Sequence, residues 1–220
     1  MAALTEKIWR LPALLLIFAI IPLASAGYHF FTIFQGIVLN IAPADPIEWL
    51  YINNPVPILL HLVPMVVFCV LGPWQLTPAA RRRFPKFHRM TGRVYVVAAL
   101  SVGLSGLYMN VAFPSEEGGL GRDVAVFLFG IIFVFGLLKG VLAARDRKIA
   151  VHRAWMIRVY AIGIGATTQR LLILPVFLTT GTASDHTIAA GIWAGWIINL
   201  LIAEWIIRRK TNTQITEVAK

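Results

Sequence analysis

Six stretches of about twenty mostly apolar residues, separated by short polar runs, dominate the sequence. A helix that crosses the hydrocarbon core of a membrane, about 30 Å thick, needs about 20 apolar residues. We expect transmembrane helices at residues 11–33, 57–74, 94–113, 123–143, 154–176 and 187–207. The chain is 58% hydrophobic and only 14% charged, whereas about a quarter of the residues of a soluble domain are charged. The sequence therefore predicts an all-α, polytopic membrane protein, with one helical bundle at 1–210 and a short polar tail at 211–220.

The first apolar segment has a second interpretation. Lys7 and Arg10 precede a core rich in Leu and Ile, and Ala24-Ser25-Ala26 resembles the cleavage site of a secretory signal peptide. Apolar residues nevertheless continue beyond that site as far as Ile37, and the rest of the chain is polytopic. We therefore expect an uncleaved first helix, and a cleaved signal peptide remains the alternative.

Charge alternates between successive connections. The second-to-third and fourth-to-fifth connections and the segment after the sixth helix are basic: Arg81, Arg82, Arg83, Lys86, Arg89, Arg93, Arg145, Arg147, Lys148, Arg153, Arg208, Arg209 and Lys210. The other connections hold one basic residue, Arg122, and six acidic ones: Asp45, Glu48, Glu116, Glu117, Asp123 and Asp185. Because basic loops stay on the cytoplasmic side, we expect both termini in the cytoplasm.

Composition and missing motifs exclude several function classes. The net charge of +10 is concentrated at helix ends, where it suits anionic lipid rather than nucleic acid. The single cysteine, Cys69, lies inside an apolar segment and cannot form an intrachain disulfide. The sequence contains no HExxH, GxSxG, CxxCH or phosphate-binding loop. The sequence indicates no catalytic residue, and haem iron is the one metal that its histidines suggest.

Two similar sequences open the third and fifth expected helices. His88-Arg89 is followed by Arg93-Val94-Tyr95, and His152-Arg153 is followed by Arg158-Val159-Tyr160. A rise of about 1.5 Å per residue places both His-Arg pairs near the basic face, with Glu204 at a similar depth. We therefore expect an inner cluster at that face, in which Arg158 pairs with Glu204.

A second group of polar residues is expected at the opposite face. His61 and Arg170 lie in the outer parts of their helices, and His29 is near the outer end of the first. Ionisable groups inside apolar helices usually mark a pathway or a necessary interhelical contact. Asn199 adds a further intramembrane polar group, on the sixth helix. Small residues four apart, at Ser101 with Ser105 and at Ala161 with Gly165, predict close helix packing.

Several of these residues resemble one known family. The matching pieces are His61, Gly72-Pro73-Trp74-Gln75, Arg83-Phe84-Pro85-Lys86-Phe87-His88-Arg89, Gly92-Arg93-Val94-Tyr95, His152-Arg153-Ala154-Trp155-Met156-Ile157-Arg158, Tyr160, Arg170, Asn199-Leu200 and Ala203-Glu204-Trp205. They resemble the bacterial predicted-membrane-protein family catalogued as domain of unknown function 2306, over about residues 57 to 207. Trp74 departs from the pattern, where another hydrophobic residue is more usual. The resemblance supports the fold and the residue set, and it implies no reaction.

The leading functional hypothesis is a membrane redox protein that binds haem b or is linked to quinone. His88 and His152 are the candidate iron ligands, with Arg89 and Arg153 as partners for the haem propionates. His61, with His29, is the candidate for a second, outer site. The simpler interpretation is that the basic residues only orient helices and bind lipid phosphate, and that Tyr95, Trp155 and Tyr160 belong to an interfacial aromatic belt.

Two alternatives remain open. A small proton-coupled transporter would use His61, Arg170 and Glu204, with Thr167, Thr168 and Gln169 in the cavity wall. The absence of a clear pair of proline- or glycine-broken helices counts against it. The other alternative is a non-catalytic scaffold, whose partner would be another membrane protein besides the lipid bilayer.

Overall fold

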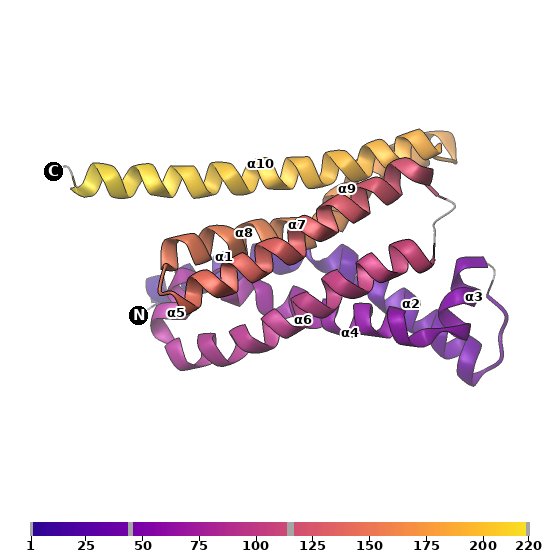
Figure 1. Ribbon diagram of the computed structural model, residues 1–220, viewed down its shortest axis with the longest axis horizontal. Coiled ribbons are helices and arrows are strands. Elements are labelled where there is room, and N and C mark those ends of the chain that lie inside the picture. Colours follow the sequence, from indigo (N-terminus) through magenta and orange to yellow (C-terminus); the bar gives the residue numbers. More distant parts are fainter. Residues whose placement is uncertain (1, 44–45, 114–116, 219–220) are drawn as a thin grey trace.

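The computed structural model describes residues 2–43, 46–113 and 117–218, which form helices and no strand. Asp45 and Glu116 of the acidic connections lie outside these residues. The helices, shown in Figure 1, are α1 (Ala2–Phe18), α2 (Ile20–Val38), α3 (Pro46–Asn53), α4 (Pro55–Gln75), α5 (Pro78–Arg83), α6 (Pro85–Ala112), α7 (Gly119–Arg145), α8 (Ile149–Gly163), α9 (Gly165–Thr180) and α10 (Asp185–Val218).

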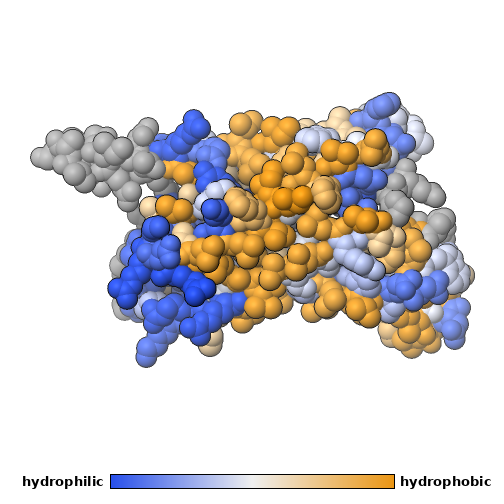
Figure 2. Space-filling model, in the orientation of Figure 1, coloured by the Kyte–Doolittle hydropathy of each residue, from blue (hydrophilic) through white to orange (hydrophobic). Residues whose placement is uncertain are grey.

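Six segments of the described chain are long and apolar enough to cross a membrane: Ile20–Val38, Pro55–Gln75, Pro85–Ala112, Gly119–Arg145, Ile149–Thr180 and Asp185–Arg209. Figure 2 shows the corresponding hydrophobic band, with hydrophilic surface at both ends. The prediction of an all-α membrane protein with six spans is confirmed.

The basic connections share one end of the bundle. In Figure 1, α5, the connection from α7 to α8, the start of α1 and the end of α10 all lie at the left. The helix α3 and the connection from α9 to α10 lie at the right, where the acidic connections were expected. These positions agree with the alternating charge pattern. The assignment of the basic end to the cytoplasm stays a prediction.

The first expected helix, at 11–33, is wrong as a continuous helix. It is interrupted at Ala19, between α1 and α2. Pro22 lacks the N–H that would bond to the carbonyl of Phe18 four residues earlier, so that carbonyl needs another donor. The hydroxyl of Thr167, on α9, donates to it at 2.8 Å.

The fifth expected helix, at 154–176, is also interrupted, at Ile164 between Gly163 and Gly165. Two side chains of α10 bind carbonyls of the last turn of α8. Asn199 Nδ2 donates to the Ala161 carbonyl at 2.9 Å, and Trp196 Nε1 donates to the Ile162 carbonyl at 3.0 Å. The expectation that the chain lacks broken helices is therefore wrong. Glycine has low helix propensity and lets the Trp196 ring approach, so the glycines favour the interruption.

The sixth expected helix, at 187–207, is longer than predicted. The helix α10 runs from Asp185 to Val218 and so includes most of the expected tail at 211–220. No Gly or Pro follows Gly195, so the sequence contains no strong signal to end the helix.

The small residues of α6 pack as expected. Ser101 Oγ donates to the Leu60 carbonyl of α4 at 2.7 Å, and Ser105 is buried in the same contact. On α9, a side chain at Gly165 would come within 2.4 Å of the Trp196 ring. Both helix pairs approach closely at these positions, as small residues permit.

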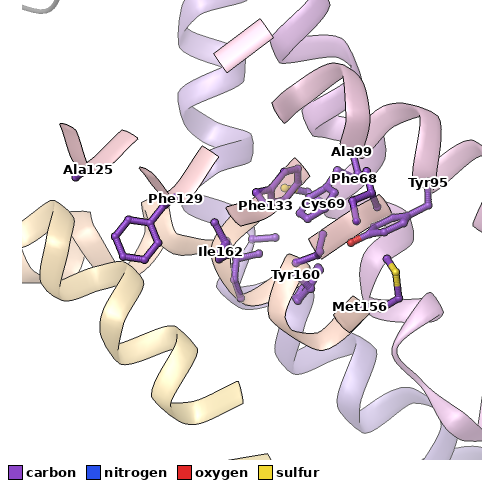
Figure 3. Close-up of a cluster of buried hydrophobic side chains, with 14 residues drawn as sticks. Phe68, Cys69, Tyr95, Ala99, Ala125, Phe129, Phe133, Met156, Tyr160 and Ile162 are labelled. Carbon is purple, nitrogen blue, oxygen red and sulfur yellow. The ribbon is translucent and has the colours of Figure 1, made fainter. Parts of the chain in front are cut away.

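A stack of three aromatic rings forms the centre of the core (Figure 3). Phe68 of α4 lies between Tyr95 of α6 and Tyr160 of α8, with ring centroids 5.0 Å and 5.6 Å away. Gly72 gives the Tyr160 ring its space, because a side chain at this position would meet the ring at 2.3 Å. The stack joins α4, α6 and α8 through direct ring contacts.

Replacing Thr167 by valine is expected to lower the free energy of unfolding by about 1–3 kcal/mol, because the Phe18 carbonyl loses its donor. Thermal unfolding in detergent measures the change. Thr179→Val is the matched control, since Thr179 is exposed and bonds only within its own helix. Equal stability of the two variants would show that the Thr167 contact does not hold the break.

Candidate ligand-binding cavity

A cavity of about 1230 Å³ opens at the basic end of the bundle. Helices α1, α5, α6, α7, α8 and α10 line it, together with the end of α4. Its lining includes six arginines and no Asp or Glu: Arg81, Arg82, Arg89, Arg93, Arg145 and Arg153. Deeper along α6, α8 and α10 the lining becomes apolar. The cavity therefore suits an amphipathic molecule with a negative group at the mouth.

Both histidines of the repeated sequence line this cavity. His152 Nδ1 lies 2.8 Å from the carbonyl oxygen of Gly140, on α7. A carbonyl only accepts, so Nδ1 carries the proton and Nε2 keeps its lone pair. A metal-binding histidine is usually oriented by such a bond. His88 is half-buried, and its ring makes no hydrogen bond with any residue that the structure describes.

Arg89 and Arg153 stand beside the two histidines, as the repeated sequence places them. Arg153 is half-buried and Arg89 is exposed, and both line the cavity. Guanidinium groups bind carboxylates and phosphates in a planar, two-point geometry. The structure thus brings together His88, His152 and their neighbouring arginines in one cavity.

The inner cluster extends to an ion pair on the side of the bundle. Arg158 Nε and Nη2 donate to the two carboxylate oxygens of Glu204, at 2.5 Å and 3.1 Å. The guanidinium also lies over the Trp155 ring, 4.9 Å from its centroid. The predicted pairing of Arg158 with Glu204 is confirmed, and Glu204 is not among the cavity's lining residues.

The residues of the expected outer cluster bond to different partners and not to one another. His61 Nδ1 lies 3.1 Å from the Val102 carbonyl, in the contact between α4 and α6. His29 Nδ1 bonds instead to the Glu48 carboxylate at 2.9 Å. Arg170 is exposed on α9, with one long contact of 3.5 Å to the Ala166 carbonyl. None of these residues lines the cavity.

Asn199 lies at the deep end of the cavity, where it has a structural role. Its amide binds the Ala161 carbonyl, and its side-chain oxygen accepts from Thr168 Oγ1 at 2.8 Å. These bonds hold α10 against the break between α8 and α9. The side chain lines the cavity with its hydrogen bonds already made to protein.

Sequence reasoning missed the role of the two tyrosines. Tyr95 and Tyr160 were interpreted as interfacial belt residues, but each is 3% exposed and lines the deep part of the cavity. The signal was present, since the two copies of Arg-Val-Tyr place both tyrosines two residues after an arginine. It could not show that Phe68 would bring the two rings into one stack.

A comparison with known families identifies the family of the chain. A sequence profile described as "Predicted membrane protein (DUF2306)" matches residues 58–207. The chain belongs to this family. The DUF2306 segment contains His61, both cavity histidines and Glu204, whereas α1 and α2 precede it. No curated protein and no solved structure matches the chain.

The two cavity histidines limit which metal centre this DUF2306 protein could hold. In the part of the chain that the structure describes, no three His, Cys, Asp or Glu side chains cluster as ligands for a metal ion. Haem places a different demand on the protein, because the porphyrin supplies four ligands and the protein adds only the axial ones. The two histidines of this cavity equal that number of ligands.

Proposed function

We propose that the chain is a redox protein of the bacterial cytoplasmic membrane that binds haem b in the inner cavity. His88 and His152 would hold the haem iron. The observation that carries the proposal is that these two histidines, 64 positions apart in the sequence (152 − 88), line one cavity.

Three features of the cavity fit haem. The carbonyl of Gly140 fixes the His152 ring with Nε2 available. Arg89 and Arg153 supply positive charge for the two propionates at the mouth. The volume, about 1230 Å³, exceeds the 300–1,000 Å³ typical of pockets for small ligands. When bound, haem iron would supply one-electron exchange with a lipid-soluble carrier, and the apolar walls would keep water away from it.

An absorption spectrum tests the proposal. The full chain, purified in detergent from haem-sufficient cells, should show a b-type band after reduction with dithionite, and a pyridine haemochrome assay should identify haem b. His88→Ala or His152→Ala should abolish or strongly shift the band, because each removes an axial ligand. His186→Ala is the control, since His186 is exposed and lies outside the cavity. A colourless but folded wild-type protein contradicts the proposal.

A small transporter is the second candidate, and the two interrupted helices favour it. The breaks at Ala19 and Ile164 are joined through Thr167 and border the deep end of the cavity. Transporters often bind substrates where discontinuous helices meet near the membrane midplane. This candidate would gain support from a colourless protein in which variants of Arg170 or His61 lose flux without losing stability. In a scaffold, the same variants would act only through folding or partner binding.

A further inference from the structure

Two tyrosine hydroxyls at the deep end of the cavity have no hydrogen-bond partner in the described chain. Tyr160 Oη is fully enclosed and unpartnered. Tyr95, also 3% exposed, lines the cavity, and its hydroxyl bonds to no described residue. Buried hydroxyls are normally hydrogen-bonded, because a buried hydroxyl without a partner costs free energy. Because Tyr160 Oη is closed to any ligand, Tyr95 is the tyrosine whose free hydroxyl a molecule in the cavity would satisfy by supplying an acceptor.

Their positions are fixed before any ligand binds. Both rings stack on Phe68, and Gly72 allows the Tyr160 ring to lie against α4. Figure 3 shows the Tyr95 hydroxyl pointing into this cluster rather than toward the surface. Tyr95 therefore presents a preorganised donor at the cavity floor, while Tyr160 Oη is enclosed by protein.

The cavity also has a wall that faces the lipid. Helix α1 contributes Leu11, Leu14, Leu15 and Phe18 to the lining, and the side chain of Leu14 is 64% exposed. Val97 of α6 lines the cavity and is 70% exposed. In a membrane these exposed apolar side chains contact lipid, so a lipid-soluble molecule can enter from the side.

We infer that the cavity floor binds the carbonyl-bearing ring of a lipid-soluble quinone, with Tyr95 Oη donating to a ring oxygen. The floor offers neutral donors in an apolar setting, which suits a carbonyl oxygen. The arginines lie nearer the basic end, so a phosphate or carboxylate would bind at the mouth instead. This inference rests on the proposed redox function, in which the quinone would exchange electrons with the haem. Quinone binding itself can be measured without haem.

The test is a titration of the detergent-purified full chain with a short-tailed benzoquinone. Isothermal titration calorimetry measures the heat of binding and gives Kd. Tyr95→Phe should raise Kd by about 3- to 10-fold, the loss of one hydrogen bond. Tyr160→Phe should have a smaller effect, because its oxygen is enclosed. Tyr108→Phe is the control, since Tyr108 is exposed and lies outside the cavity. Neither Tyr95→Phe nor Tyr160→Phe should lower the melting temperature, because neither hydroxyl has a protein partner to lose.

Two further measurements separate the outcomes. The His88→Ala, His152→Ala double variant should still bind the quinone, so failure of the haem proposal alone leaves this binding intact. Dodecyl phosphate tests the other ligand class, an anionic lipid. The inference is overturned if the wild type binds no quinone or if Tyr95→Phe binds it unchanged. It is also overturned if dodecyl phosphate binds with the same dependence on Tyr95.

Discussion

Replacing His29 by alanine is expected to lower the free energy of unfolding by about 1–3 kcal/mol, the cost of leaving a buried acceptor without its hydrogen-bond partner. Glu48 of α3 is 2% exposed, and His29 Nδ1 contacts its Oε1 at 2.9 Å. Its Oε2 is enclosed, with no partner in the described residues. Without the imidazole, the carboxylate would stay buried with neither oxygen partnered by a side chain.

Thermal unfolding in detergent, with circular dichroism as the readout, measures this effect. The double variant His29→Leu, Glu48→Leu should recover most of the loss, because it removes both polar groups together. His186→Ala provides the control, since His186 is exposed on the first turns of α10. A loss in His29→Ala no greater than in this control would mean that the pair does not stabilise the fold.

The spans and the inner cluster were predictable because membrane thickness converts sequence position into depth. His88 and His152 each precede an apolar segment in a basic connection, so they had to lie at the same face. The same argument matched Arg158 with Glu204, which the structure confirms. Depth does not give the angle around a helix, however. That is why Arg170, expected beside His61, instead lies exposed on α9.

The helix breaks were harder to predict because their stability comes from distant side chains. The sequence shows that Pro22 has no N–H to donate to the Phe18 carbonyl. The hydroxyl that replaces this donor belongs to Thr167, 145 positions later (167 − 22). The break at Ile164 likewise depends on Trp196 and Asn199 of α10. A hydropathy pattern records none of these contacts, so each broken segment was interpreted as one continuous helix.

The buried Glu48 and the tyrosine pair were missed for a related reason. A carboxylate in a connection is normally solvated, and only the folding of α3 against α2 places Glu48 beside His29. Tyr95 and Tyr160 lie near helix ends, where tyrosine usually marks the membrane interface. Their burial follows from Phe68, which stands between them on a third helix.

Replacing Arg158 by leucine is expected to lower the stability of the membrane-embedded protein by about 1–3 kcal/mol, because the Glu204 carboxylate loses both hydrogen bonds from the guanidinium. The Glu204 carboxylate would remain without its arginine partner. The cation–π contact between the guanidinium and the Trp155 ring would also be lost. The charge swap Arg158→Glu, Glu204→Arg should restore part of the loss. Restoration should be incomplete, because an arginine at 204 would lie one turn from Arg208.

Melting temperature in lipid nanodiscs measures this cycle, with Lys139→Leu as the control. Lys139 is exposed, and its ammonium lies over the Phe135 ring with no acidic partner in the described chain. Because its removal leaves no charge behind, Lys139→Leu should cost far less than Arg158→Leu. A swap variant no more stable than the single variants would show that the attraction between the two charges contributes nothing. The stabilisation at this position would then come from the cation–π contact with Trp155.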